Sequence, residues 1–282
     1  MKIMPKRSVF LGIVLWIALW ILLAGNIAPL WANNVKIVAG SSLISDIVLA
    51  LTEGEAEVLT VIPGASCPGH EAVKTTDLVF AADADMILVH AFQQKLPWLS
   101  SMKTAGEDGK PQLVVLETEG SWLVPEVQKE AVRDIAVILA DAFPAWRETL
   151  FERARTRLAC VDTAEREVLT RLAPLKGAVV AASEMQADFV RWAGLEVPVT
   201  YGRPEAMHPM ELVEQIQRLS DRHIAGVIDN WQSGADAGLP LAMELAVPHV
   251  VLSGFPGFRK DVPDYGALLR YNAEQLLKLG AE

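Results

Sequence analysis

A thiol and an imidazole lie three residues apart in the stretch Cys67-Pro68-Gly69-His70. The run before it, Val58 to Ile62, is rich in β-branched residues and is predicted to form a strand that ends in this loop. A Pro-Gly pair is typical of a type II turn, which would hold the Cα atoms of Cys67 and His70 within about 7 Å. Two soft to borderline donors held so close indicate a metal chelate. The simpler interpretation is that Pro-Gly only ends the strand and that His70 is an exposed loop residue.

The amino terminus has the layout of an export signal. Lys2, Lys6 and Arg7 precede the run Val9 to Ala24, which is 16 residues long and carries no charge. This run is slightly long for the core of a signal peptide and slightly short for a spanning helix. We therefore expect residues 1–32 to be a signal peptide or N-terminal anchor, with cleavage after Ala32, and a periplasmic or extracytoplasmic location.

The charge balance argues against some partners. The chain of 282 residues has a formal net charge of −10, and removal of residues 1–32 takes away three positive charges and no acids, giving −13. So acidic a protein is a poor partner for nucleic acid or anionic lipid. Export exposes Cys67 and Cys160 to oxidation. We expect no disulfide between them, because Cys160 falls inside a long helical pattern while Cys67 lies in the turn.

Strand and helix patterns alternate along the chain, with a helical interruption in the middle. The alternation predicts an α/β lobe at residues 33–143, which includes a helix from Pro125 to Ala142. A long linking helix is predicted at 144–174, where Pro144 fits the first turn, and a second α/β lobe at 175–282. The predicted fold is α/β: two three-layer lobes with mainly parallel sheets, joined by one long helix, with a binding cleft between the lobes. Periodicity alone would equally allow this helix to pack on a single domain.

Several short motifs, taken in order, resemble one family of transport proteins. These are Pro63-Gly64-Ala65 followed by His70 and Asp77-Leu78, then Ala84-Asp85-Met86, Trp122-Leu123 with Pro125, Gly194-Leu195, and Tyr271-Asn272. Their order and spacing resemble the zinc- and manganese-specific periplasmic solute-binding proteins of metal ABC importers. The resemblance implies a non-enzymatic, monomeric receptor for ion transport, which holds a metal ion between its lobes and delivers it to a membrane permease.

The same resemblance implies four ligand positions, and most of them depart from the family pattern. The first is His70, but the second is occupied by Gly120 and the fourth falls near Ser253, neither of which is a strong ligand. The third is Ser183 or, if one residue is skipped, Glu184. The architecture therefore transfers better than the ligand set does.

Other residues could complete the site. Cys67 could supply a thiolate, or be a thiol buried as a small hydrophobe. His90 ends the predicted buried strand Met86 to His90, at the edge where α/β crevices bind ligands, or it only caps that strand. Glu184 and Asp229 could each ligate, or instead interact with the start of a helix. The predicted metal ligands are His70, Cys67, His90, Glu184 and Asp229. This mixed set suits Zn²⁺; Co²⁺, Ni²⁺ or Cu also fit, and Mn²⁺ is less natural with a thiolate.

Two further hypotheses remain open from the sequence. In the first, the depleted ligand set marks a binding protein of the same fold for a metal chelate or small organic ligand, with His70 and Trp231 in the pocket. In the second, the chain is an exported hydrolase or redox enzyme that uses Cys67 with His70 or His90 as base. The enzyme hypothesis is the weakest, because the sequence shows no third orienting group and no oxyanion loop.

Overall fold

The computed structural model describes residues 35–67, 73–106, 109–203, 209–219 and 221–280. The expected signal peptide or anchor at 1–32, and the Pro68, Gly69 and His70 part of the predicted turn, lie outside these ranges. Within the described residues, no helix is both long and apolar enough to cross a membrane.

The N-terminal lobe is built on a parallel sheet of four strands in the order β2-β1-β3-β4. The strands are β1 (Val35–Ala39), β2 (Ala56–Thr60), β3 (Met86–His90) and β4 (Gln112–Leu116), and the helices are α2 (Ser42–Thr52), α3 (Thr75–Ala82) and α4 (Pro97–Lys103). Every residue of β3 is buried, as its continuous apolar run predicts. Ser41 caps α2 by accepting a hydrogen bond from the Ile44 amide.

The C-terminal lobe repeats this arrangement with the strand order β6-β5-β7-β8. Its strands are β5 (Val179–Ser183), β6 (Glu196–Tyr201), β7 (Ile224–Asn230) and β8 (His249–Leu252), and its helices are α7 (Ala187–Trp192), α8 (Pro209–Leu219) and α9 (Leu239–Leu245). In both sheets the strand order reverses beside the first strand, between β1 and β3 and between β5 and β7. Such switch points are where open parallel sheets bind ligands.

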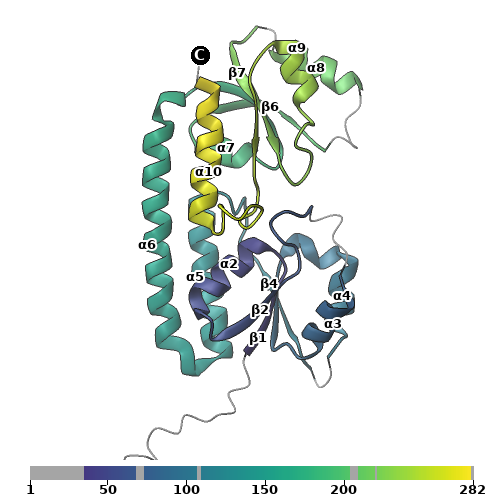
Figure 1. Cartoon of the computed structure of the whole chain (residues 1–282), viewed down its shortest axis with the longest axis vertical. Coiled ribbons are helices and arrows are strands. Elements are labelled where there is room, and N and C mark those ends of the chain that lie inside the picture. Colours follow the sequence, from purple (N-terminus) through teal and green to yellow (C-terminus); the bar gives the residue numbers. More distant parts are fainter. Residues whose placement is uncertain (1–34, 68–72, 107–108, 204–208, 220, 281–282) are drawn as a thin grey trace, which may run out of the picture. The chain divides into compact units, whose positions relative to one another are not determined.

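Three long helices connect and cover the lobes. They are α5 (Pro125–Ala142), α6 (Arg147–Leu172) and α10 (Tyr265–Leu277), and α6 packs against both of the others. Figure 1 shows α6 running beside both lobes. Short 3₁₀ turns, Pro144–Trp146 and Ala173–Leu175, flank α6. The predicted fold class, two parallel α/β lobes with one long helix, is confirmed; the domain boundaries at 143 and 174 stay a prediction.

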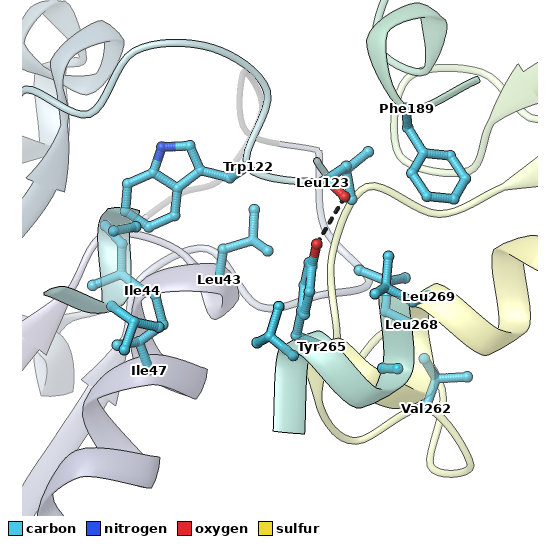
Figure 2. Packing of buried hydrophobic residues seen from close by; sticks show 14 of the residues in the cluster. Leu43, Ile44, Ile47, Trp122, Leu123, Phe189, Val262, Tyr265, Leu268 and Leu269 are labelled. Carbon is cyan, nitrogen blue, oxygen red and sulfur yellow. Dashed lines mark hydrogen bonds between the residues drawn. The ribbon is translucent and has the colours of Figure 1, made fainter. Parts of the chain in front are cut away.

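One hydrophobic core continues from the first lobe into the second. It includes Leu43 and Ile47 of α2, Leu123 after β4, and Tyr265 and Leu269 of α10. In Figure 2 the Tyr265 ring reaches toward the Leu123 backbone, to whose carbonyl its hydroxyl donates a 2.9 Å hydrogen bond. The lobes are thus held together by α6 and also by a direct apolar contact.

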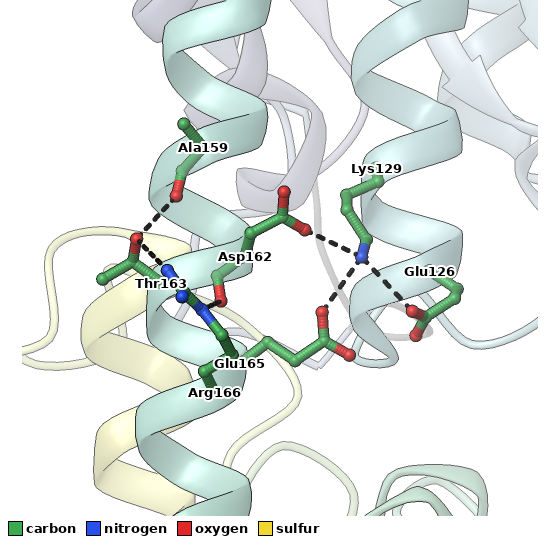
Figure 3. Close-up of polar contacts among 7 residues, drawn as sticks. All are labelled: Glu126, Lys129, Ala159, Asp162, Thr163, Glu165 and Arg166. Carbon is green, nitrogen blue, oxygen red and sulfur yellow. Dashed lines mark hydrogen bonds and ion pairs between the residues drawn. The ribbon is translucent and has the colours of Figure 1, made fainter.

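A cluster of charges joins α5 to α6. The Lys129 ammonium donates to Glu126, Asp162 and Glu165 at 3.0 to 3.2 Å (Figure 3). Burial opposes the positive charge, but the three carboxylates outweigh it and raise the pKa of Lys129. The network therefore keeps a half-buried lysine charged and fixes the two helices against each other.

A buried ion pair lies where α2, α6 and α10 meet. The Asp46 carboxylate accepts hydrogen bonds from the Arg157 guanidinium and, at 3.2 Å, from the Tyr265 amide. Burial raises the pKa of Asp46 from 3.8 to about 6, although Arg157 and the Tyr265 amide lower it and the charge of Asp264 adds to the rise. Folding therefore favours the protonated carboxyl.

This shift predicts a pH dependence of stability. The folded state binds the Asp46 proton more tightly than the unfolded state does. The stabilisation that this proton gives is therefore fully present below about pH 3.8 and is lost as the pH rises through about 6. The free energy of unfolding of the wild type, minus that of Asp46→Asn, should fall by up to about 3 kcal/mol between pH 4 and pH 7. Urea unfolding at both pH values measures this difference. Asp221→Asn, at an exposed aspartate, controls for the loss of a charge, and parallel wild-type and Asp46→Asn profiles would contradict the expectation.

Candidate functional site

A cleft of about 850 Å³ lies between the two lobes. Among the residues that the structure describes, the lining includes residues that follow the carboxyl ends of β1, β3 and β4 in the N-terminal lobe and of β5, β6, β7 and β8 in the C-terminal lobe. The residues include Leu43, His90 and Trp122 from the N-terminal lobe, and Met185, Arg203 and Asn230 from the C-terminal lobe. Both sheets therefore direct their carboxyl edges, and both switch points, toward one cleft, as expected for a ligand site in this fold.

His90 lies at the switch point of the N-terminal sheet, in the wall of this cleft. Its Nε2 forms a 2.7 Å hydrogen bond with Ser41 Oγ, which follows the neighbouring strand β1. The ring packs edge-on against Trp122 and stacks on Phe92. A buried amide, that of Gln93, accepts a hydrogen bond from the His90 backbone and donates one to the Gly40 carbonyl. The imidazole is therefore fixed in position by both strands.

Burial also controls the charge of His90. It lowers the pKa of the imidazole from 6.5 to about 3, so the ring is neutral at physiological pH. A neutral imidazole can offer one nitrogen lone pair to a ligand or metal ion. Because Nε2 is engaged with Ser41, a metal ion could be bound only through Nδ1, with the Nε2 proton donated to Ser41 Oγ.

The C-terminal sheet has a matching polar pair at its switch point. Gln186, after β5, donates a 2.7 Å hydrogen bond to Asn230 Oδ1 at the end of β7, and Asn230 donates to Ser233. Both Asn230 and Ser233 line the cleft. The residue predicted from the sequence is the preceding one, Asp229. Neighbouring residues of a strand point to opposite faces, and the sequence does not show which face of β7 lines the cleft.

The loop that carries Cys67 is fastened to the C-terminal lobe. Gln232 donates a 2.7 Å hydrogen bond to the Gly64 carbonyl and another to Ser253, and it accepts one from the Gly254 amide. A Cβ atom on Gly64 would overlap the carbonyl oxygen of Pro256 and lie 2.5 Å from the Phe258 nitrogen. Only glycine allows this close approach between the lobes.

The structure describes part of the predicted Cys-His turn. The Ser66 amide donates a 3.0 Å hydrogen bond to the Pro63 carbonyl, so a turn comes directly before Cys67. Cys67 is half-buried, Cys160 is exposed, and both are free thiols. Since His70 lies outside the described residues, its convergence with Cys67 stays a prediction.

The two predicted carboxylate ligands lie in different surroundings. Glu184 is exposed directly after β5, where its amide donates to the Tyr201 carbonyl. Asp229 is fully buried on the other face of β7; it accepts hydrogen bonds from the Tyr201 hydroxyl and the Gly238 amide and pairs with His249 Nε2 at 2.6 Å. Those contacts bind Asp229 into its own lobe. Both assignments as ligands stay predictions.

The positions implied by the resemblance are occupied by residues that have other roles. Gly120 lines the cleft with a φ of +92°, a conformation that side chains other than glycine rarely adopt. Ser253 is fully buried, where it accepts from Gln232 and donates to the Phe255 carbonyl. Ser183 is buried at the end of β5. Across the described residues, no three His, Cys, Asp or Glu side chains converge to hold a metal ion.

The lobes, the linking helix and the shared cleft define a two-lobe solute-binding protein. The chain belongs to the family described as zinc-uptake complex component A, periplasmic, which it matches over residues 37–279. That family consists of metal-binding transport components. Among curated protein sequences, none matches the chain significantly.

Solved structures share the fold. A metal-free serine-to-alanine mutant of a periplasmic metal-binding protein from Candidatus Liberibacter asiaticus aligns with a TM-score of 0.74 and 15% identity, covering 86% of this chain and 98% of that one. The manganese-bound form of that protein aligns with a TM-score of 0.73 and 15% identity, with the same coverage. A structure of ZnuA aligns at 0.73 with 18% identity, covering 87% of this chain and 99% of its own.

Proposed function

We propose that this protein captures Zn²⁺ in the cleft between its lobes and delivers it to the permease of an ABC importer. The observation that carries the proposal is His90, a neutral imidazole fixed at a switch point in the wall of the interlobe cleft. Family membership supports metal uptake as the role, without a catalytic step. Residues 1–32 would direct export or anchor the protein, which would act as a monomer.

His70 and Cys67 would complete the site with His90. The Pro63–Ser66 turn and the contact of Gly64 with the C-terminal lobe support this, because they hold the start of the Cys-His loop against both lobes. Thiolate and imidazole donors favour Zn²⁺ over Mn²⁺. A carboxylate from the C-terminal lobe, Glu184 or Asp229, would be the fourth ligand. Glu184 is exposed, whereas the Asp229 carboxylate already has three partners, and neither is among the described residues that line the cleft.

Calorimetric titration of the mature protein with Zn²⁺, together with thermal shift against other divalent ions, tests this proposal. His70→Ala and Cys67→Ser should each weaken Zn²⁺ binding at least about tenfold, because a ligand is lost. Cys160→Ser is the matched control: it removes the other free thiol, on the exposed face of α6, and should leave the affinity unchanged. Zn²⁺ should also protect Cys67 from thiol reagents. A mature protein that binds no divalent ion and gains no thermal stability from any would refute the proposal.

A further inference from the structure

The size of the interlobe cleft exceeds what a bare ion requires. Four donors hold Zn²⁺ at about 2.0 to 2.3 Å, whereas the cleft measures about 850 Å³. Cavities of roughly 300 to 1,000 Å³ are typical of sites for small organic molecules. We propose that the cleft binds its metal ion as a complex with a small carboxylate-bearing chelator. This inference rests on the proposed function and specifies the chemical form in which the metal ion is bound.

The positive charge on the C-terminal wall of the cleft favours a ligand that carries a carboxylate, whereas the two lining glutamates lie on the N-terminal wall. Among the described residues on that wall, Arg203 is the only one with a charge, and its neighbours there are Met185, Asn230, Gln232, Ser233, Gly254 and Phe255. A guanidinium repels a free divalent cation. The same group binds a carboxylate through two parallel hydrogen bonds, which gives a chelator both affinity and orientation.

The remaining polar groups on this wall suit an organic ligand better than a dication. Asn230 and Gln232 are amides held in place by Gln186, Ser233 and Ser253. Amides offer both donors and acceptors but carry no charge to neutralise a metal ion. They are the kind of few, fixed polar groups that orient a small molecule.

The N-terminal wall supplies the other half of the site. Phe92 and Trp122 contact the His90 ring and give this wall apolar surface for the body of a chelator. His90, Glu117 and Glu119 are the groups on this wall that can bind the metal ion of the complex. The two glutamates are exposed and also repel the carboxylates of a chelator. The complex would therefore bind with its metal toward this wall and a carboxylate toward Arg203.

Native mass spectrometry and calorimetry of the mature protein, with citrate and L-histidine as the two chelators, test the inference. Zn²⁺ supplied with either chelator should add the mass of metal plus chelator to the protein, while the chelator alone should add none. Arg203→Gln should weaken binding of the complex at least tenfold and should not weaken binding of Zn²⁺ alone. Arg222→Gln, an equal loss of charge at an exposed position in the same lobe, should change neither.

The outcomes separate this inference from the proposed function. If citrate and L-histidine only compete for Zn²⁺, and the protein retains the metal without any chelator mass, the inference is wrong while the proposed function stands. If Arg203→Gln and wild type bind both complexes equally, the inference is also wrong. If neither Zn²⁺ nor its complexes bind, the proposed function itself fails.

Discussion

Replacing Tyr265 by alanine should lower the free energy of unfolding by about 3 to 5 kcal/mol, the usual loss for a fully buried aromatic side chain. Tyr265 is the first residue of α10 and has no solvent exposure. Its ring packs in the core that both lobes share, and its hydroxyl donates to the Leu123 carbonyl of the N-terminal lobe (Figure 2). The substitution therefore removes apolar contacts and a hydrogen bond at the junction of the lobes.

Urea unfolding followed by tryptophan fluorescence measures this effect. Tyr265→Phe separates the two contributions: it keeps the ring, leaves the Leu123 carbonyl without this donor, and should cost about 1 to 2 kcal/mol. For a protein of this size the alanine variant should melt roughly 10 °C lower. If Tyr265→Ala loses no more stability than Tyr265→Phe, packing of the Tyr265 ring does not stabilise the junction of the lobes.

The fold could be predicted because hydrophobic periodicity is a local signal. The apolar run Met86 to His90 and the helix Pro125 to Ala142 were predicted with the bounds that the structure shows. Pro125 marks where α5 begins, and Pro144 begins the 3₁₀ turn that precedes α6. The paired lobes then follow from alternating strands and helices, because parallel strands need helical crossovers.

The walls of the cleft could be predicted only in part, because they depend on which face a side chain takes. His90 was placed correctly at the carboxyl edge of a buried strand, and it lines the cleft. Asn230, which lines the cleft, was not predicted, whereas its neighbour Asp229 was; one position along a strand reverses the face on which a side chain lies. Arg203 lies in the loop after β6, where no periodic pattern marks it.

The contact at Gly64 depends on tertiary structure that the sequence does not reveal. The sequence contains 19 glycines, and nothing local distinguishes the one that meets another lobe. In the structure the Gly64 carbonyl accepts from Gln232, and backbone atoms of residues 256–258 fill the space where a side chain would be. Pro63-Gly64 is part of the motif that the family shares, but the motif alone does not show why glycine is needed at position 64.

Gly64→Ala should therefore reduce both stability and metal affinity. The added methyl group would overlap backbone atoms, which cannot move aside as the end of a side chain can, so the loop must separate from the C-terminal lobe. Overpacking of this kind costs about 1 to 3 kcal/mol. Cys67 follows three residues later, so the proposed thiolate ligand would move with the loop. We expect Zn²⁺ affinity to fall at least tenfold in calorimetric titration.

The control for Gly64→Ala is Gly202→Ala, because a Cβ atom at Gly202 would approach no other atom closer than 4.0 Å, the nearest being Glu184 Oε2. This control should keep wild-type stability. Gln232→Leu provides an independent test, since it removes the hydrogen bond to the Gly64 carbonyl without adding bulk to the loop. It should weaken Zn²⁺ binding in the same direction as Gly64→Ala. Wild-type affinity in both Gly64→Ala and Gln232→Leu would mean that docking of this loop on the C-terminal lobe does not position a metal ligand.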